Sequence, residues 1–233
     1  MPATRDIHSR AALDEGLGRL QSDVRRLASL TDVAIERSFR ALERLDQDMA
    51  REVIEGDARI NDLRYEIEEH GILLIATQQP IARDLRTIVA VLSIAPELER
   101  MADYCVGIGR IVKLHGDQPL LKPLVDLPRM RDIVREMLRD AVDAFIARDA
   151  KRAEEVARRD EEVDRLYDQI YRELLTFMLG DPRTIARATW LIWVAHNFER
   201  MADRIQNICE RTVYEATGVM REFSGAEPRH DPH

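Results

Sequence analysis

Apolar side chains recur at alternating steps of four and three residues through the first 45 positions of the chain. This spacing places them on one face of an α-helix, in the a and d pattern of a helix that packs along its whole length. We therefore expect one long first helix, which ends or breaks near Asp46. Its apolar face consists of Leu13, Leu17, Leu20, Val24, Leu27, Thr31, Ala34, Ser38, Ala41 and Leu45.

Five more helices are expected further along the chain. Gly56 and Asp57 interrupt the first pattern, and Asp57 can cap a second helix that runs to about Gln78. Pro80 and Pro182 stand where two later helices begin, because proline suits the first helical turn. No stretch of the sequence alternates as a β-strand does. The other expected helices cover about residues 80–114, 128–148, 160–179 and 182–217.

The two halves of the chain are related. The segment LERLDQDMAREVIEGD (42–57) matches FIARDAKRAEEVARRD (145–160) at an offset of 103 residues, which pairs Asp46 with Asp149. The pentapeptide ERMAD occurs at 99–103 and again at 199–203. This repetition indicates an internal duplication of a three-helix unit.

The expected fold class is therefore all-α, with two tandem three-helix bundles and six helices in total. The first repeat covers residues 1–116 and the second covers 128–220. The segment 117–127 contains Pro119 and Pro123 and has the composition of a linker. Residues 221–233 are expected to form a flexible tail.

Composition narrows the function. The formal charge is −8, from 35 basic and 43 acidic residues, which argues against nucleic acid as a partner. No apolar run approaches the roughly 18 residues of a transmembrane helix, and the N-terminus lacks the apolar stretch of a signal peptide. We expect a cytoplasmic protein. Cys105 and Cys209 lie in helical patterns without metal-site spacing, so we interpret them as core residues.

The repeated pentapeptide carries a pair of acidic residues. Glu99 with Asp103, and Glu199 with Asp203, are four positions apart, so each pair shares one helix face and its charges repel. Either the carboxylates spread into water or something positive lies between them. Oxygen ligands of this kind favour hard cations such as magnesium, calcium, manganese or oxidised iron.

The second helix of each repeat adds another polar pair four residues apart. Asp57 precedes Asn61 in the first repeat, and Asp160 precedes Asp164 in the second. If the second and third helices of each repeat are antiparallel, these oxygens converge on the acidic pairs. A single ExxxD in so charged a chain is usually a solvated face. Its occurrence at equivalent positions in both repeats favours a ligand site.

The sequence gives no sign of an enzyme. Its expected helices lack the Glu-x-x-His spacing of ferritin-like di-iron proteins, and the sequence has no phosphate-binding GxxxxGK loop, GxSxG elbow or HExxH motif. We therefore predict a protein without catalytic residues.

Two long segments carry a recognisable pattern: IEGDARINDLRYEIEEHGILLIATQQPIARDLRTIVAVLSIAPELERMADY and DEEVDRLYDQIYRELLTFMLGDPRTIARATWLIWVAHNFERMADRIQNICE. Both resemble the PhoU family of phosphate-specific transport system accessory proteins. The similarity extends from about residue 8 to 220. Its specific motifs are the Glu-Gly-Asp junction, Gln-Gln-Pro-x-Ala-x-Asp-Leu-Arg and the doubled Glu-Arg-x-x-Asp.

The resemblance implies a cytoplasmic negative regulator of phosphate uptake and of the phosphate-starvation (Pho) response. Its implied partners are the ATPase subunit of the phosphate ABC importer, a membrane sensor histidine kinase and a second copy of the chain in a homodimer. The family's acidic motifs imply divalent or trivalent metal ions, such as iron, magnesium, manganese or zinc, also as multinuclear clusters. Asn61 departs from the motif. The matching positions are Glu99, Asp103, Glu199, Asp203, Asp160 and Asp164, and we include Asp57 with them.

Three other interpretations are open. The first is a metal-storage or metal-sensing carboxylate bundle unrelated to phosphate. The second is a carboxylate metalloenzyme such as a phosphatase, which needs a bound nucleophile and an open coordination position. In the third, the acidic faces dock arginine-rich proteins, and binding depends strongly on salt without metal.

Overall fold

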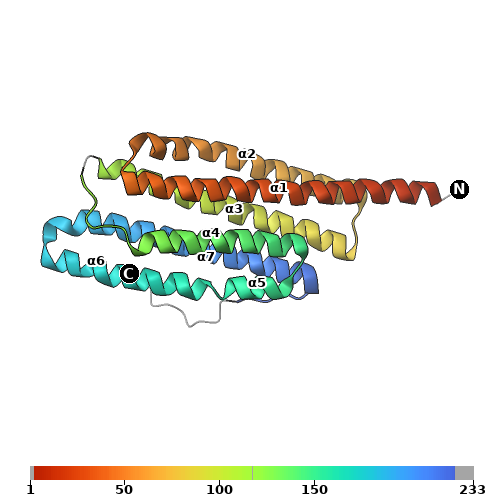
Figure 1. The fold of residues 1–233 in the computed structure, drawn as a ribbon. Helices are drawn as coiled ribbons and strands as arrows, with labels where there is room; N and C mark the ends of the chain where they lie inside the picture. The colour runs from red at the N-terminus through yellow and green to blue at the C-terminus, as the bar shows by residue number, and fades with distance from the viewer. Residues whose placement is uncertain (1–2, 117, 224–233) are drawn as a thin grey trace.

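The computed structural model describes residues 3–116 and 118–223, and the regular secondary structure of this part of the chain is all helix, with no strand (Figure 1). The expectation of an all-α fold is confirmed. The elements are α1 (Ala3–Arg44), α2 (Gln47–Gln78), α3 (Ala82–His115), α4 (Asp126–Ala147), α5 (Ala150–Ala157), α6 (Asp160–Gly180), the 3-10 turn η1 (Pro182–Thr184) and α7 (Ile185–Thr217).

Each repeat is a three-helix unit. Helices α1, α2 and α3 pack together in the first repeat, and α4, α5 with α6, and α7 pack together in the second (Figure 1). The short α5 and the following α6 together occupy the place of α2, interrupted at Arg158 and Arg159. Counted in this way, the six predicted helices are present.

The turn between the first two helices is the same in both repeats. Leu45 and Arg148 both have the left-handed conformation, with φ of 52° and 55°. The next residues, Asp46 and Asp149, each accept a hydrogen bond from the backbone N–H three positions later, at 2.9 and 3.0 Å, and so cap α2 and α5. The pairing of these two residues by the duplication is therefore reproduced in the geometry.

The predicted start of the second helix at Asp57 is wrong. Helix α2 begins ten residues earlier at Gln47, so Gly56 and Asp57 lie inside it. The reason is that Asp46 supplies the cap directly after the left-handed Leu45, while a single glycine inside a helix weakens it by only about 1 kcal/mol without ending it. Asp57 is thus a side chain on a helix face, one turn before Asn61.

The two repeats join along α3 and α7, which run antiparallel (Figure 1). Thr87 near the start of α3 donates a hydrogen bond to Glu215 near the end of α7, at 2.8 Å. At the opposite end, the rings of His115 and Trp190 lie 5.1 Å apart. This arrangement places both copies of ERMAD near the middle of the antiparallel pair.

Helices α1 and α4 also join the repeats. The Arg135 guanidinium of α4 binds the Asp32 carboxylate of α1 through two nitrogens, at 2.7 and 2.9 Å, and the Glu36 carboxylate at 2.6 Å. Below this polar layer, the fully buried rings of Phe39 and Phe198 lie 6.2 Å apart. The core is therefore continuous from one repeat to the other.

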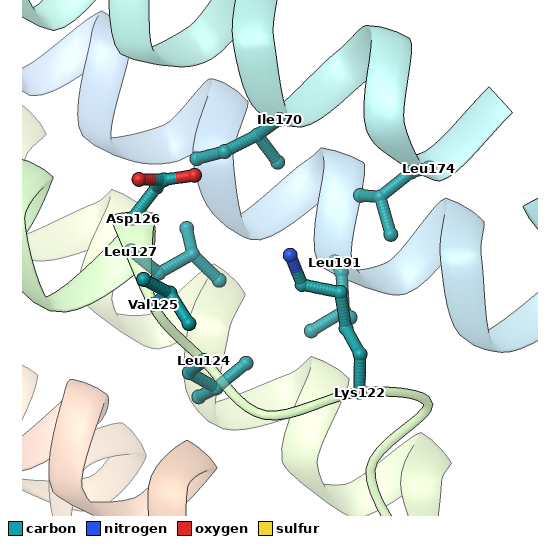
Figure 2. Close-up of a pocket in the computed structure, with 8 residues that line it drawn as sticks. All are labelled: Lys122, Leu124, Val125, Asp126, Leu127, Ile170, Leu174 and Leu191. Carbon is teal, nitrogen blue, oxygen red and sulfur yellow. The ribbon is translucent and has the colours of Figure 1, made fainter. Parts of the chain in front are cut away.

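The segment that connects the repeats packs on the second repeat. Leu120, Leu121 and Leu124 lie against the apolar core, and the Lys122 ammonium forms an ion pair with Glu173 of α6. Figure 2 shows the small cavity that the segment closes, between Leu127 and Leu191; its volume is about 10 Å³, room for about one water molecule.

Part of the predicted tail is described. The backbone N–H of Phe223 donates to the Glu210 carboxylate at 2.8 Å, so residues 221–223 return to α7. Residues 224–233 of that prediction lie outside the described residues. No helix in the described part of the chain is both long and apolar enough to cross a membrane.

The end of α3 gives a pH-dependent prediction. His115 is buried, with its Nδ1 2.8 Å from the Gln118 carbonyl oxygen, and burial lowers its pKa, helped by the positive charge of Arg187. Because the unfolded pKa of about 6.5 is higher, the unfolded chain takes up the proton first as the pH falls. The stabilising contribution is complete above about pH 6.5 and is lost progressively as the pH falls below that value toward the lower pKa of the folded chain.

We therefore expect His115→Gln to flatten the pH dependence of stability. Urea unfolding at pH 7.5 and pH 5 should show a smaller loss of unfolding free energy in the variant than in the wild type. The same measurement on His70→Gln provides a comparison. The pKa of His70 is also lowered by burial, so this variant too should lose less unfolding free energy than the wild type. Equal losses in wild type and His115→Gln would show that His115 titrates as it does in the unfolded chain.

Candidate metal centre

The acidic pairs of ERMAD face the second helix of each repeat and not the seam between α3 and α7. Glu97 Oε2 of α3 accepts hydrogen bonds from α7, from Arg204 and Asn207. Glu99 is two positions further along, about 200° around the helix, so it lies on the side of α3 away from α7. Between the acidic ends of the motif, Met101, Ala102, Met201 and Ala202 are buried.

In the first repeat, the structure brings three predicted carboxylates together. Glu99 and Asp103 belong to α3, and Asp57 faces them from α2. The pKa of Glu99 is raised by burial, and then by the negative charges of Asp103 and Asp57, against the lowering effects of Arg64 and Arg100. These groups therefore form one electrostatic cluster, and a cation would relieve its repulsion.

The carboxyl group of Asp57 shows the same electrostatic repulsion in its pKa. Its pKa is raised by burial first and by Asp103 second, while a hydrogen bond from Asn61 and the charge of Arg110 lower it. The Asn61 amide donates to Asp57 Oδ2 at 2.9 Å. Asp57 Oδ1 and Asn61 Oδ1 are both buried, and neither has a hydrogen-bond partner among the described residues. Two oxygen acceptors of the kind that hard cations bind thus face inward here.

In the second repeat, the protein supplies a positive group of its own. Arg200 Nε lies 3.7 Å from Glu199 Oε2, and Arg200 Nη1 lies 3.2 Å from Asp203 Oδ2. The guanidinium therefore bridges the two carboxylates of the pair. The Glu199 side chain is only 7% exposed, and His196 Nδ1 lies 3.5 Å from the same oxygen.

The other predicted residues of the second repeat lie on α6, which packs against α7. Asp160 is the first residue of this helix and is buried, and Asp164 follows one turn later and is half-buried. Tyr167, on the next turn, has its pKa raised by burial and then by the negative charge of Glu199. The tyrosine ring lies 6.0 Å from that of His196.

The sequence interpretation gave no role to the arginine of the repeated motif or to the position three residues before each glutamate. Arg200 was visible as the second letter of ERMAD, beside both carboxylates. Position 96 is proline and the equivalent position 196 is histidine, so only the second repeat places an imidazole beside its glutamate. The two sites therefore differ in charge and in hydrogen-bonding capacity.

The donor chemistry fits a hard cation, with an important restriction. Within residues 3–116 and 118–223, no three His, Cys, Asp or Glu side chains come close enough together to hold one metal ion. Magnesium, which keeps several water molecules and needs only one or two carboxylates, suits such open sites. One or two carboxylates would hold it at each site, drawn from Glu99, Asp103 and Asp57 in the first repeat and from Glu199, Asp203, Asp160 and Asp164 in the second.

The fold and this site define a class of protein: a duplicated three-helix bundle that carries one acidic pair per repeat, facing the second helix of that repeat. A sequence profile described as the PhoU domain matches residues 24–112 and 127–212, one match in each repeat. The chain therefore belongs to the PhoU family.

Individual relatives agree along nearly the whole chain. The chain is 39% identical over 225 residues to the "Phosphate-specific transport system accessory protein PhoU homolog" of Caulobacter vibrioides, covering 96% of this chain and 97% of that protein. It is 37% identical to the homolog of Zymomonas mobilis over 211 residues, which cover 91% and 89% of the two chains.

Solved structures confirm the architecture. The crystal structure of the phosphate transport system regulatory protein PhoU from Streptococcus pneumoniae matches with a TM-score of 0.84 and 30% identity, over 90% of this chain and 99% of that one. PhoU from Pseudomonas aeruginosa matches with the same TM-score and 31% identity, over 88% and 99%.

Proposed function

We propose that this chain is a cytoplasmic negative regulator of phosphate uptake and of the phosphate-starvation response. Full-length similarity to accessory and regulatory proteins of phosphate transport supports the proposal. The structural observation that carries it is the equivalent placement of the two acidic pairs, each on a long helix and facing the second helix of its own repeat. Its output is a changed protein contact, not a chemical reaction.

The partners proposed are the ATPase subunit of the phosphate ABC importer and a membrane sensor histidine kinase, with the chain itself as a homodimer. The acidic clusters suit such a role because charge at an interface steers association and selects partners. A bound hard cation would supply positive charge to a cluster that is otherwise negative. In the first repeat, Asp57 and Glu99 would bind this cation. The pKa values of both are raised, in part by neighbouring negative charges that the cation would offset.

The test of this function is genetic. The gene is deleted in its host, and phosphate uptake and a phosphate-starvation reporter are measured in phosphate-replete medium. We expect derepression that the wild-type gene reverses. A four-carboxylate variant, with alanine at positions 99, 103, 199 and 203, should fail to reverse it.

The outcomes separate the competing functions. Full reversal by the four-carboxylate variant would keep the regulator and remove the acidic pairs from its mechanism. A reporter that stays repressed in the deletion strain would contradict the proposal. A response to metal supply instead of phosphate supply would identify a metal-storage or metal-sensing bundle.

Metal binding by the second repeat has its own prediction. Glu199→Ala with Asp203→Ala should lose the Mg²⁺ or Mn²⁺ bound by the second site, because both carboxylates of the pair are removed while the positive guanidinium of Arg200 remains. Calorimetric titration and metal content per chain measure the loss. The matched control is Glu136→Ala with Asp140→Ala, an acidic pair with the same spacing on α4 that is neutralised by Arg159. Unchanged metal content in the first variant would exclude this site.

A further inference from the structure

An open groove lies between α1 and α2 of the first repeat, away from the seam between the repeats. Its volume is about 110 Å³, and Ala102 of α3 also lines it. A dry cavity of roughly 150 Å³ accepts benzene. This groove is smaller but open, so it has room for most of one six-membered ring. Its lining residues are the apolar Leu30, Val33, Ala34, Val53, Gly56, Ile60 and Ala102 and the charged Arg37, Glu52, Asp57 and Arg59.

A small residue keeps one wall of the groove open. A Cβ added at Gly56 would meet no atom within 4 Å. The second repeat offers an internal comparison, because the offset of 103 places Arg159 at the position of Gly56. Arg159 reaches α4 and binds Glu136 at 2.7 Å and Asp140 at 3.3 Å. A long side chain thus spans the space in the second repeat that the first repeat leaves open.

The charges around the groove are also reversed between the repeats. Arg37 and Arg59 stand where the second repeat has Asp140 and Glu162. Arg37 is in an ion pair with Glu52, whereas the exposed Arg59 makes no hydrogen bond or ion pair with the described residues. A guanidinium left open beside an apolar groove is a ready partner for a carboxylate.

We propose that this groove binds a small amphipathic carboxylate. Its apolar body lies against Val33 and Ala34, and its carboxylate binds the Arg59 guanidinium. Of the two acidic residues of the lining, Glu52 is paired with Arg37, and Asp57 Oδ2 accepts a hydrogen bond from the Asn61 amide while its Oδ1 has no hydrogen-bond partner among the described residues. The ligand carboxylate is therefore placed at the Arg59 guanidinium, because Asp57 repels an anion.

Benzoate is the probe for the test, followed by NMR of the methyl groups of Val33, Ala34 and Ala102. We expect saturable shifts with a dissociation constant on the order of 1 mM, as suits a fragment-sized ligand. Gly56→Leu should weaken binding by about tenfold or more, because its side chain occupies the groove. Gly18→Leu is the control: Gly18 is exposed on α1, outside the groove, and a Cβ there also meets no atom within 4 Å.

The anion requirement is tested separately. Arg59→Glu, which introduces the residue found in the second repeat, should weaken benzoate binding by about tenfold, and benzyl alcohol should bind the wild type more weakly by a similar factor. Arg25→Glu, an exposed arginine of α1 outside the groove, should leave binding unchanged. Three results would overturn the proposal: no shift with benzoate, equal binding by Gly56→Leu and wild type, or equal binding of benzyl alcohol and benzoate.

Discussion

Replacing Phe39 by alanine should lower the free energy of unfolding by about 3–5 kcal/mol. Phe39 is fully buried on α1, its ring lies 6.2 Å from that of Phe198 on α7, and the Arg131 guanidinium of α4 lies 4.6 Å from its centre. The substitution leaves a cavity that three helices from both repeats surround. Total stabilities of about 5–15 kcal/mol are usual, so the loss is a large part of the whole.

Urea unfolding followed by circular dichroism measures this effect. Because the ring contacts both repeats, we expect one cooperative transition at a lower urea concentration, not the unfolding of one repeat alone. Phe39→Leu keeps most of the volume and should cost less than about 1.5 kcal/mol. Leu179→Ala, at a side chain that is 86% exposed, should have little effect. A loss below about 1 kcal/mol for Phe39→Ala would show that the cavity collapses without consequence.

Replacing Arg148 by methionine should cost about 3–5 kcal/mol, through a different mechanism. Arg148 Nε lies 2.9 Å from Glu215 Oε1, and the Glu215 side chain is 0% exposed. Thr87 donates to the same oxygen at 2.8 Å. Without the guanidinium, the carboxylate stays buried with only a hydroxyl donor, and an uncompensated buried charge is expensive.

A double-mutant cycle separates the charge from the packing. Glu215→Gln in the Arg148→Met background should recover much of the lost stability, because it removes the isolated charge. The surface ion pair of Arg183 with Asp181 provides the control, and Arg183→Met should leave the unfolding free energy nearly unchanged. If the double variant is no more stable than Arg148→Met alone, the cost arises from lost contacts of the arginine stem.

Long-range regularities of the sequence predicted the fold well. The three-and-four spacing from Leu13 to Leu45 predicted a buried stripe, and Leu20, Val24 and Leu27 are fully buried on α1. The doubled ERMAD predicted equivalent positions in the two repeats. Both predictions rest on the periodicity of residues along the chain, which helix packing preserves.

Local geometry was harder to predict. The start of α2 depends on the left-handed conformation of Leu45, a residue with no intrinsic preference for it, so the cap at Asp46 was less evident than the glycine at 56. In the candidate site, the sequence placed the carboxylates on one face but could not show that Arg200 bridges Glu199 and Asp203. Such contacts depend on side-chain rotamers and neighbouring helices.

The contact between Asp32 and Arg135 bears on how the two repeats became specific for each other. These residues occupy equivalent positions, 103 apart, and they bind each other across the α1–α4 junction. In a symmetric pair of identical units, a residue beside the twofold axis meets its own copy. Two first repeats would set Asp32 against Asp32, and two second repeats would set Arg135 against Arg135. Because the two repeats belong to one chain, they can carry opposite charges at this position. The first repeat therefore pairs with the second more favourably than either repeat would pair with another copy of itself.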